Sequence, residues 1–385
     1  MKKQIIKKIN SKIISGYFGD GKYYGFKKKK IISLVKIFVS NNLYAYGESL
    51  VGSYSPELYK INLKYISKLI EKKNPYEALK ICKKIQNNKF FFYQGILKSI
   101  IASIEIALIN LIAKIEDLNF PQTINKIYFE NKLKKINTIK IYGSAGSILS
   151  SEKDIKKDIM KANQLGINIL KIRININSKY KEKINILRNN TKDFAIDLIS
   201  NSFEKNRNFK KLGQFLSYIC KEKILWLEEV LNTEDLDNFF IIKKKYKLKY
   251  SYGENFNSKY DFLNLINYFK FNYINLDISH CPISDFVEII KFMQKNKIRK
   301  KIIFHCWGSI INFYTSLELA SIFNEFVYKV ELPITNFTLN DKFLSSSYIK
   351  NSEFTLIENS KNFNNFYDKN NSSNKNLKKY SFSFD

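Results

Sequence analysis

The sequence predicts an α/β fold in which a TIM-type (β/α) barrel follows an α+β region. Short apolar runs recur along the chain after residue 136, and each has a polar or ionisable residue at or next to its end. A segment long enough for a helix follows each run, and 24 residues separate the run ends at Arg173 and Asp197. Strands that alternate with helices at such a spacing predict a parallel sheet.

The chain has eight such runs, which is the number of strands that closes a barrel of this type. They span residues 139–142, 169–174, 194–197, 225–229, 249–254, 273–277, 302–305 and 327–331. The carboxyl ends of all strands open at one mouth in this fold, so we expect the polar run ends to converge there. A chain of 385 residues has room for the barrel and one further domain.

The region before the barrel predicts an antiparallel hairpin followed by helices. Residues 31–39 and 43–48 read as the two strands, and Asn41 and Asn42 between them supply the turn. The pair Ser55-Pro56 predicts the start of a helix, with Ser55 as N-cap and the proline at the first helical position.

Residues 96–115 have apolar side chains at helical spacing, and the stretch is long enough to span a membrane. It also carries Lys98, Glu105 and Lys114, so we expect a core helix and no membrane partner. No continuous apolar segment follows the basic start of the chain, which argues against a secretory signal. The four cysteines show no paired spacing, and a reduced, cytoplasmic location is expected.

These patterns predict two domains. Residues 1–135 form an α+β capping domain, which the C-terminal segment 336–385 is expected to join, and residues 136–335 form the barrel. We expect the loop at 15–27 to close over the barrel mouth and to select the substrate. We also expect a homo-oligomer.

The composition is strongly basic, with 65 Lys and Arg against 35 Asp and Glu and a formal net charge of +30. Such a charge would attract a polyanion. However, Lys, Asn, Ile, Phe and Tyr are enriched together along the whole chain, as AT-rich codons would produce. No zinc-finger, RNP or helix-turn-helix pattern accompanies the charge, so we expect no specific nucleic-acid partner.

The run ends supply a candidate metal site and a candidate base. Asp197, Glu228 and Glu254 end three consecutive runs, and carboxylate oxygens are the ligands that Mg²⁺ prefers. Asp277 and His305 end adjacent runs, so the carboxylate is placed to orient the imidazole as a general base.

Lys171 and Arg173 share one run and alternate by two residues, so their side chains point to the same face of the strand. They would add positive charge beside the cation. Glu331 ends the last run.

Taken in order, these residues resemble the mandelate racemase/muconate lactonizing enzyme group of the enolase superfamily. The resemblance covers residues 30–335, and each motif is short. The matching motifs are Ala45-Tyr-Gly-Glu-Ser49, Ile104-Glu-Ile-Ala-Leu108, Lys171-Ile-Arg173, Trp226-Leu-Glu-Glu229, Gly253-Glu-Asn255, Asp277 and His305-Cys-Trp-Gly308. The resemblance implies a modified enolase-type barrel that uses Mg²⁺ to remove the proton α to the carboxylate of a small-molecule substrate.

The resemblance also implies a role for each residue. Asp197, Glu228 and Glu254 would be the Mg²⁺ ligands, and His305 the acid/base that Asp277 orients. Lys171 would contact the substrate carboxylate, and Glu331, if protonated, would donate a hydrogen bond to the enediolate. Removal of the α-proton would leave an enediolate, whose negative charge needs preorganised positive charge. The metal and the cationic side chains would supply it.

Departures from the family pattern bear on the reaction. Arg173 stands where the family has a second Lys, and a guanidinium is a poor base and a good electrostatic clamp. One base then remains, which favours dehydration of an acid sugar or other hydroxy acid to a 2-keto acid. A racemase or epimerase is the alternative, and a catalytically inactive basic binding protein is an alternative of another class. Ile199, Val230 and Cys281-Pro282-Ile283 also differ from the family's usual residues.

Overall fold

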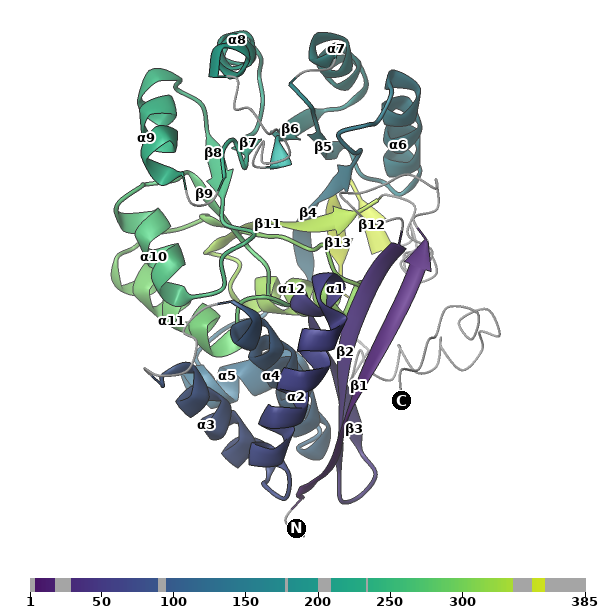
Figure 1. Ribbon diagram of the computed structural model, residues 1–385, viewed down its shortest axis with the longest axis vertical. Helices are drawn as coiled ribbons and strands as arrows, with labels where there is room; N and C mark the ends of the chain where they lie inside the picture. Colours follow the sequence, from purple (N-terminus) through teal and green to yellow (C-terminus); the bar gives the residue numbers. More distant parts are fainter. Residues whose placement is uncertain are drawn as a thin grey trace.

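The structure is a computed structural model that describes residues 4–17, 29–88, 95–176, 179–199, 209–232, 235–334 and 348–356. It consists of an N-terminal α+β part, which we call the cap, and a barrel that follows it in sequence (Figure 1). The predicted loop at 15–27 falls largely outside the described residues.

The cap comprises a three-stranded antiparallel sheet, in the order β1-β2-β3, and the helices that pack against it. Its elements are β1 (Ile6–Tyr17), β2 (Lys29–Val39), β3 (Tyr44–Ser49), α1 (Val51–Tyr54), α2 (Pro56–Ile70), α3 (Pro75–Gln86), α4 (Ile96–Ile115) and α5 (Phe120–Phe129). The predicted hairpin is confirmed as β2–β3, with Asn42 at φ 62° in the turn. Pro56 does begin α2, but the side chain of Ser55 makes no capping hydrogen bond, because its backbone has φ −140° and ψ 73°.

Helix α4 is the centre of the cap. It is long and apolar enough to cross a membrane, with a mean hydropathy of 2.0, yet 94% of that stretch is buried inside the protein. The predicted core helix is therefore confirmed. The helix approaches β3 so closely that a Cβ at Gly47 would lie 1.8 Å from the carbonyl oxygen of Ser103.

The barrel is closed by eight parallel strands in sequence order, because the last strand pairs with the first. The strands are β4 (Thr138–Ala145), β5 (Ile169–Arg173), β6 (Asp193–Asp197), β7 (Leu227–Glu228), β8 (Tyr250–Tyr252), β9 (Tyr273–Leu276), β10 (Ile302–Phe304) and β11 (Val327–Pro333). The helices between them are α6 (Glu152–Gln164), α7 (Tyr180–Asn190), α8 (Phe209–Ile219), α9 (Leu236–Lys245), α10 (Lys259–Asn267), α11 (Ile283–Lys295) and α12 (Ile310–Ile322). The predicted fold class is confirmed.

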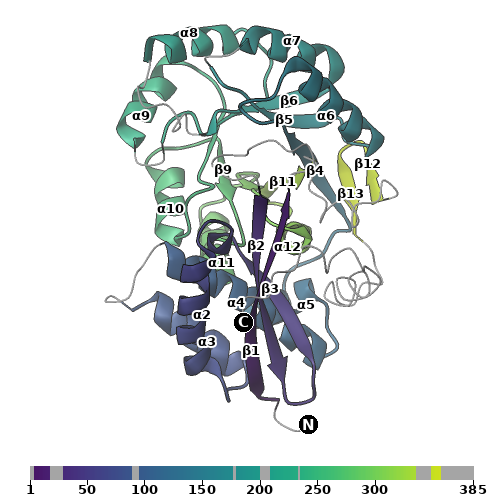
Figure 2. The same cartoon turned by 45° about the vertical axis from the view of Figure 1, so that its right-hand side comes forward.

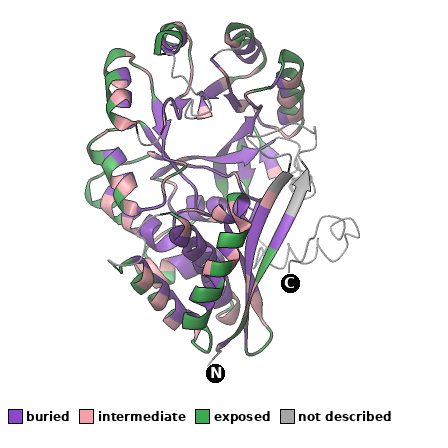
Figure 3. Ribbon diagram, in the orientation of Figure 1, coloured by how far each residue is buried: buried purple, intermediate pink, exposed green. Residues whose placement is uncertain are grey.

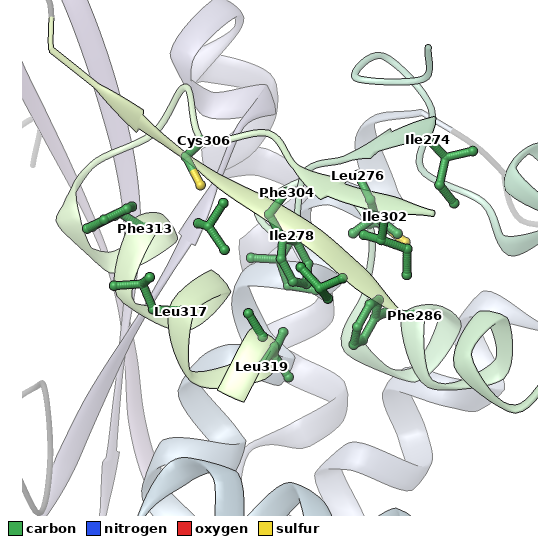
Figure 4. Packing of buried hydrophobic residues seen from close by; sticks show 14 of the residues in the cluster. Ile274, Leu276, Ile278, Phe286, Ile302, Phe304, Cys306, Phe313, Leu317 and Leu319 are labelled. Carbon is green, nitrogen blue, oxygen red and sulfur yellow. The ribbon is translucent and has the colours of Figure 1, made fainter. Parts of the chain in front are cut away.

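The barrel strands are buried on both faces, as expected for parallel strands that helices cover on the outside (Figures 2 and 3). Figure 4 shows the outer packing, where Phe304 of β10 lies near Phe286 of α11, with 5.4 Å between the ring centroids. Inside the barrel, Trp226 contacts Tyr142 edge to face at 5.0 Å. The packing outside and inside the barrel holds the strands in place, and with them the strand ends that carry the polar side chains.

Only residues 348–356 of the C-terminal segment 336–385 are described. They form the hairpin β12 (Ile349–Lys350) and β13 (Glu353–Thr355), and β13 pairs antiparallel with β4 of the barrel. This part of the segment thus lies on the barrel. The first residues of β4, 138–140, have no parallel partner strand, and their open edge accepts β13. The domain boundaries at 135 and 335 stay predictions.

Candidate active site

The residues that the sequence singled out all lie at the carboxyl ends of barrel strands. Lys171 and Arg173 are in β5, Asp197 ends β6, Glu228 ends β7, Glu254 follows β8, Asp277 follows β9, His305 follows β10 and Glu331 is in β11. The regular alternation of strand and helix therefore gathers side chains from seven strands around one mouth.

Three of the carboxylates lie close enough to share one cation. One oxygen each from Asp197, Glu228 and Glu254 lies within 4.8 Å of the other two. Asp197 and Glu228 are fully buried, and Glu254 is partly open to the mouth. Burial raises the pKa of Glu228 to about 7, and the charges of Asp197 and Glu254 add to the rise against the opposing effect of Lys171. The three carboxylates therefore repel one another where they meet.

Neighbouring groups hold two of these carboxylates in place. The indole Nε1 of Trp226 donates to Glu228 Oε2 at 2.9 Å. Trp226, which lies inside the barrel, thus orients the carboxylate of Glu228. Glu229 Oε1 accepts from the backbone N–H of Gly253 at 2.7 Å, which fixes the residue before Glu254. Glu229 is completely buried, and its contact shows that it supports the site instead of lying on the surface.

Lys171 is the central cation of the cluster. Its ammonium group donates to Glu228 Oε1 and lies 3.2 Å from Glu331 Oε1 and 3.6 Å from Asp197 Oδ2. The side chain has no exposed surface. Burial alone would lower the pKa of Lys171, but the surrounding carboxylates raise it above its ordinary value. Lys171 is therefore a fixed positive charge in this arrangement.

Arg173 lies on the same face of β5, as its spacing from Lys171 predicted. Its Nε is 3.5 Å from Asp197 Oδ2, and NH1 donates to the carbonyl oxygen of Gly146 at 3.3 Å. The guanidinium also stacks on Trp307, with Cζ 4.9 Å from the ring centroid. Trp307, in the loop after β10, thus connects the Arg173 side of the mouth with the His305 side.

Asp277 and His305 form a buried pair. Nδ1 of His305 lies 2.8 Å from Asp277 Oδ2, which leaves Nε2 to face the mouth, 3.4 Å from Glu254 Oε2. Burial lowers the pKa of His305, but Glu254, Glu331 and Asp277 together raise it to about 10. The Asp–His arrangement is one that suits proton transfer at Nε2.

Glu331 lies beside Lys171 and the start of the loop after β10. Its Oε2 accepts from the backbone N–H of Cys306 at 3.3 Å, and its Oε1 faces Lys171. Burial raises the pKa of Glu331, but Lys171, His305 and Arg173 lower it well below the usual range of a carboxyl group. In both contacts Glu331 is the acceptor, and its role as a hydrogen-bond donor to an enediolate stays a prediction.

Two further residues at the mouth were missed by sequence reasoning. Asn312 of α12 donates through Nδ2 to Asp277 Oδ1 at 3.0 Å. Glu48 of β3, in the cap, accepts from the backbone N–H of Asn312 at 3.2 Å. Glu48 stands inside the cap motif quoted above, but only the assembled structure shows that it contacts the barrel.

The comparison with solved structures bears on the fold. The chain is similar to the 3,6-anhydro-D-galactonate cycloisomerase of Zobellia galactanivorans, with 18% identity, a TM-score of 0.76, and coverage of 98% of this chain and 100% of that one. It is similar to a member of the enolase superfamily from Agrobacterium tumefaciens, with 13% identity, a TM-score of 0.74 and coverage of 92% and 94%.

A third similar structure is an enolase from Bradyrhizobium complexed with magnesium and mandelic acid, with 12% identity, a TM-score of 0.70 and coverage of 93% and 94%. No protein-family model and no curated protein matches the sequence. The likeness to solved structures extends over almost the whole of each chain and includes both the cap and the barrel. The chain therefore has the fold of the enolase superfamily, a closed (β/α) barrel with an α+β cap.

Proposed function

We propose that this protein is a Mg²⁺-dependent enzyme that removes the proton α to a substrate carboxylate. We propose further that it dehydrates a sugar acid or another hydroxy acid to a 2-keto acid, which makes it a hydro-lyase. The observation that carries the proposal is the position of the His305 imidazole beside the carboxylate cluster. The other nitrogen-containing side chains at the cluster, Lys171 and Arg173, are poor bases.

The donor set fits Mg²⁺. All three proposed ligands offer carboxylate oxygens, which hard cations prefer, and no sulfur or imidazole is among them. The charge count points the same way. Five carboxylates face the cationic groups of Lys171 and Arg173 and the imidazole of His305, so negative charge is in excess whether or not His305 is protonated. A divalent cation would offset that excess. The similar Bradyrhizobium protein was solved with magnesium and a hydroxy acid.

Mg²⁺ held by Asp197, Glu228 and Glu254 would supply positive charge to the developing enediolate and would neutralise Glu254, one of the carboxylates that raise the pKa of His305. Nε2 of His305 then takes the α-proton, and the electron pair of the C–H bond moves toward the substrate carboxylate. Asp277 stabilises the imidazolium through Nδ1. Lys171 and Arg173 add fixed positive charge where the negative charge develops.

The second half of the reaction needs an acid. The imidazolium of His305 gives its proton to the β-hydroxyl group, which leaves as water with the electrons of the C–O bond. The enol that remains tautomerises to the 2-keto acid. Arg173 cannot take over as a second base, because a guanidinium keeps its proton, and the ammonium group of Lys171 is held by Glu228 and Glu331. This is why we favour dehydration over racemisation or epimerisation.

The test is incubation of the purified protein with Mg²⁺ and a panel of acid sugars and hydroxy acids in deuterium oxide. Keto-acid formation and α-deuterium uptake are both measured. We compare His305→Asn with His280→Asn, the only other histidine of the chain, as the matched control.

Keto acid that disappears with chelator and in His305→Asn, but not in His280→Asn, is the expected result. Deuterium uptake without keto acid would favour the racemase or epimerase. A protein that binds no Mg²⁺ and exchanges no proton would refute the proposal.

A further inference from the structure

A buried carboxylate of the cap lies at the amino end of barrel helix α12. Glu48 Oε1 accepts from the N–H of Ser309 at 2.7 Å, and Oε2 accepts from Ser309 Oγ at 2.6 Å and from the N–H of Asn312 at 3.2 Å. The residue is 1% exposed. A helix leaves its first N–H groups without partners within the helix and concentrates positive charge there, so a carboxylate stabilises this end.

The contact is sterically specified as well. A Cβ at Gly308, the residue before Ser309, would lie 2.5 Å from Glu48 Oε1 and 2.8 Å from Cβ of Asn312. Glycine at this position therefore allows β3 of the cap and the start of α12 to approach each other. The cap and this barrel helix are fitted together around one carboxylate.

Helix α12 in turn holds the Asp277–His305 pair. Asn312 has no exposed surface, and its Nδ2 donates to Asp277 Oδ1 at 3.0 Å. Its Oδ1 accepts from Ser316 Oγ at 3.4 Å, which fixes the orientation of the amide. The first turn of α12, anchored by Glu48, thus sets the position of one donor to the Asp277 carboxylate.

A second set of cap contacts reaches the same carboxylate oxygen. The N–H and Oγ of Ser279 donate to Asp277 Oδ1 at 2.8 and 2.6 Å. The carbonyl oxygen of Ser279 accepts from the N–H of Leu50 and from Ser99 Oγ, both in the cap and both at 3.0 Å. All of these donors bind Oδ1, so Oδ2 is left for Nδ1 of His305.

We propose that Glu48 and Asn312 are positioning residues through which the cap fixes the orientation of the His305 imidazole. Both residues are buried, Glu48 with 1% and Asn312 with none of its surface exposed. They act by occupying Oδ1 of Asp277 and holding its plane, so that Nε2 of His305 points into the mouth. The inference rests on the proposed function for its catalytic consequence, but its structural part is measured without any substrate.

The experiment compares Asn312→Leu and Glu48→Gln with Glu105→Gln. Leucine has about the size of asparagine but no donor, and glutamine keeps the shape of glutamate but loses its charge. Glu105 is the matched control, because it is also a buried cap carboxylate at the start of a barrel helix. It accepts from the N–H of Ser284 at 2.9 Å and from its Oγ at 2.8 Å, at the start of α11.

The readout is NMR of the ¹⁵N-histidine-labelled, Mg²⁺-loaded protein, in which only His280 and His305 contribute. A proton between Nδ1 of His305 and Asp277 gives a downfield signal protected from exchange. We expect this signal to broaden or vanish in Asn312→Leu and Glu48→Gln and to persist in Glu105→Gln. Wild-type signals in both test variants would overturn the proposal. If Asn312→Leu does not fold, judged by circular dichroism, Glu48→Gln decides.

The kinetic readout uses the α-proton exchange. We expect kcat to fall about 10- to 100-fold in the two test variants, with KM nearly unchanged, because a displaced base costs rate and not binding. A rise in KM alone would contradict a positioning role. If the wild type exchanges no proton but the NMR signal responds as expected, the proposed function fails while the positioning stands.

Discussion

Replacing Lys171 with methionine tests how the carboxylate cluster is held together. The ammonium group of Lys171 contacts Glu228 and lies 3.2 Å from Glu331 and 3.6 Å from Asp197. Methionine has a similar length but no charge, so the variant leaves several buried carboxylates without their common partner. The variant should therefore lose stability in the absence of metal.

The expected loss is that of breaking a buried ion pair by removing one partner, about 3–5 kcal/mol. The entropy of unfolding is about 2.1 cal/mol/K per residue, or about 0.8 kcal/mol/K for 385 residues that unfold together. The melting temperature of metal-free Lys171→Met should therefore fall by about 4–6 °C. Differential scanning calorimetry with chelator present measures this change.

Magnesium should then recover part of the loss. The wild type gains about 2.7 kcal/mol when the free Mg²⁺ concentration is 100 times Kd. Lys171→Met should gain more, because the two charges of the cation replace the missing ammonium group among the same oxygens. Lys98→Met is the control, since Lys98 forms a buried ion pair with Asp285 outside the carboxylate trio.

The control should lose stability but gain only the wild-type increment from Mg²⁺. An equal Mg²⁺ increment in all three proteins would refute the reasoning, because it would mean that the lysine and the metal do not share ligands.

Three other predictions follow from single contacts. Burial lowers the pKa of His305, but nearby carboxylates outweigh this effect and raise it from 6.5 to about 10. Protonation of His305 therefore stabilises the metal-free fold fully below pH 6.5, and this stabilisation is lost as the pH rises to 10. The stability lost in His305→Asn, measured by urea unfolding, should thus shrink between about pH 6 and pH 10. Gly47→Ala should cost about 1–3 kcal/mol or more, since its Cβ meets the Ser103 carbonyl at 1.8 Å; an unchanged urea midpoint would contradict this. Trp307→Ala should lower kcat/KM about 2- to 30-fold, because Arg173 loses a stacking contact of about 0.5–2 kcal/mol; steady-state kinetics on an acid of the panel that the wild type converts decide it.

The strand-end residues were predictable because the barrel repeats. Each strand is a short apolar run, and each run end is displayed at the same face, so Asp197, Glu228 and Asp277 could be placed without knowing any contact between them. The hairpin β2–β3 was predictable for a similar local reason, its Asn41-Asn42 turn. Strand β1 was missed, because residues 6–17 contain Lys, Asn and Ser between their apolar positions and pair only through β2.

Contacts between distant parts of the chain were not predictable. Glu48 and Ser309 are 261 residues apart, and nothing in the local sequence of either indicates the other. The pKa of Glu331 is a similar case, because Lys171 and His305, which lower it against the effect of burial, approach it only in the closed barrel. Local patterns therefore locate candidate residues, whereas their protonation and support depend on the assembled cluster.

The many lysines of the chain show why burial must be read together with charge. Lys183 and Lys329 have only 5% and 6% of their surface exposed, and burial lowers the pKa of both, to about 8 for Lys329. The pKa of Lys171 is instead raised, because carboxylates surround it. A chain rich in lysine for compositional reasons has no need to place one among carboxylates, where both partners lose their hydration. Such a placement is costly unless the charges are used together, which supports the carboxylate cluster as the site of the proposed reaction.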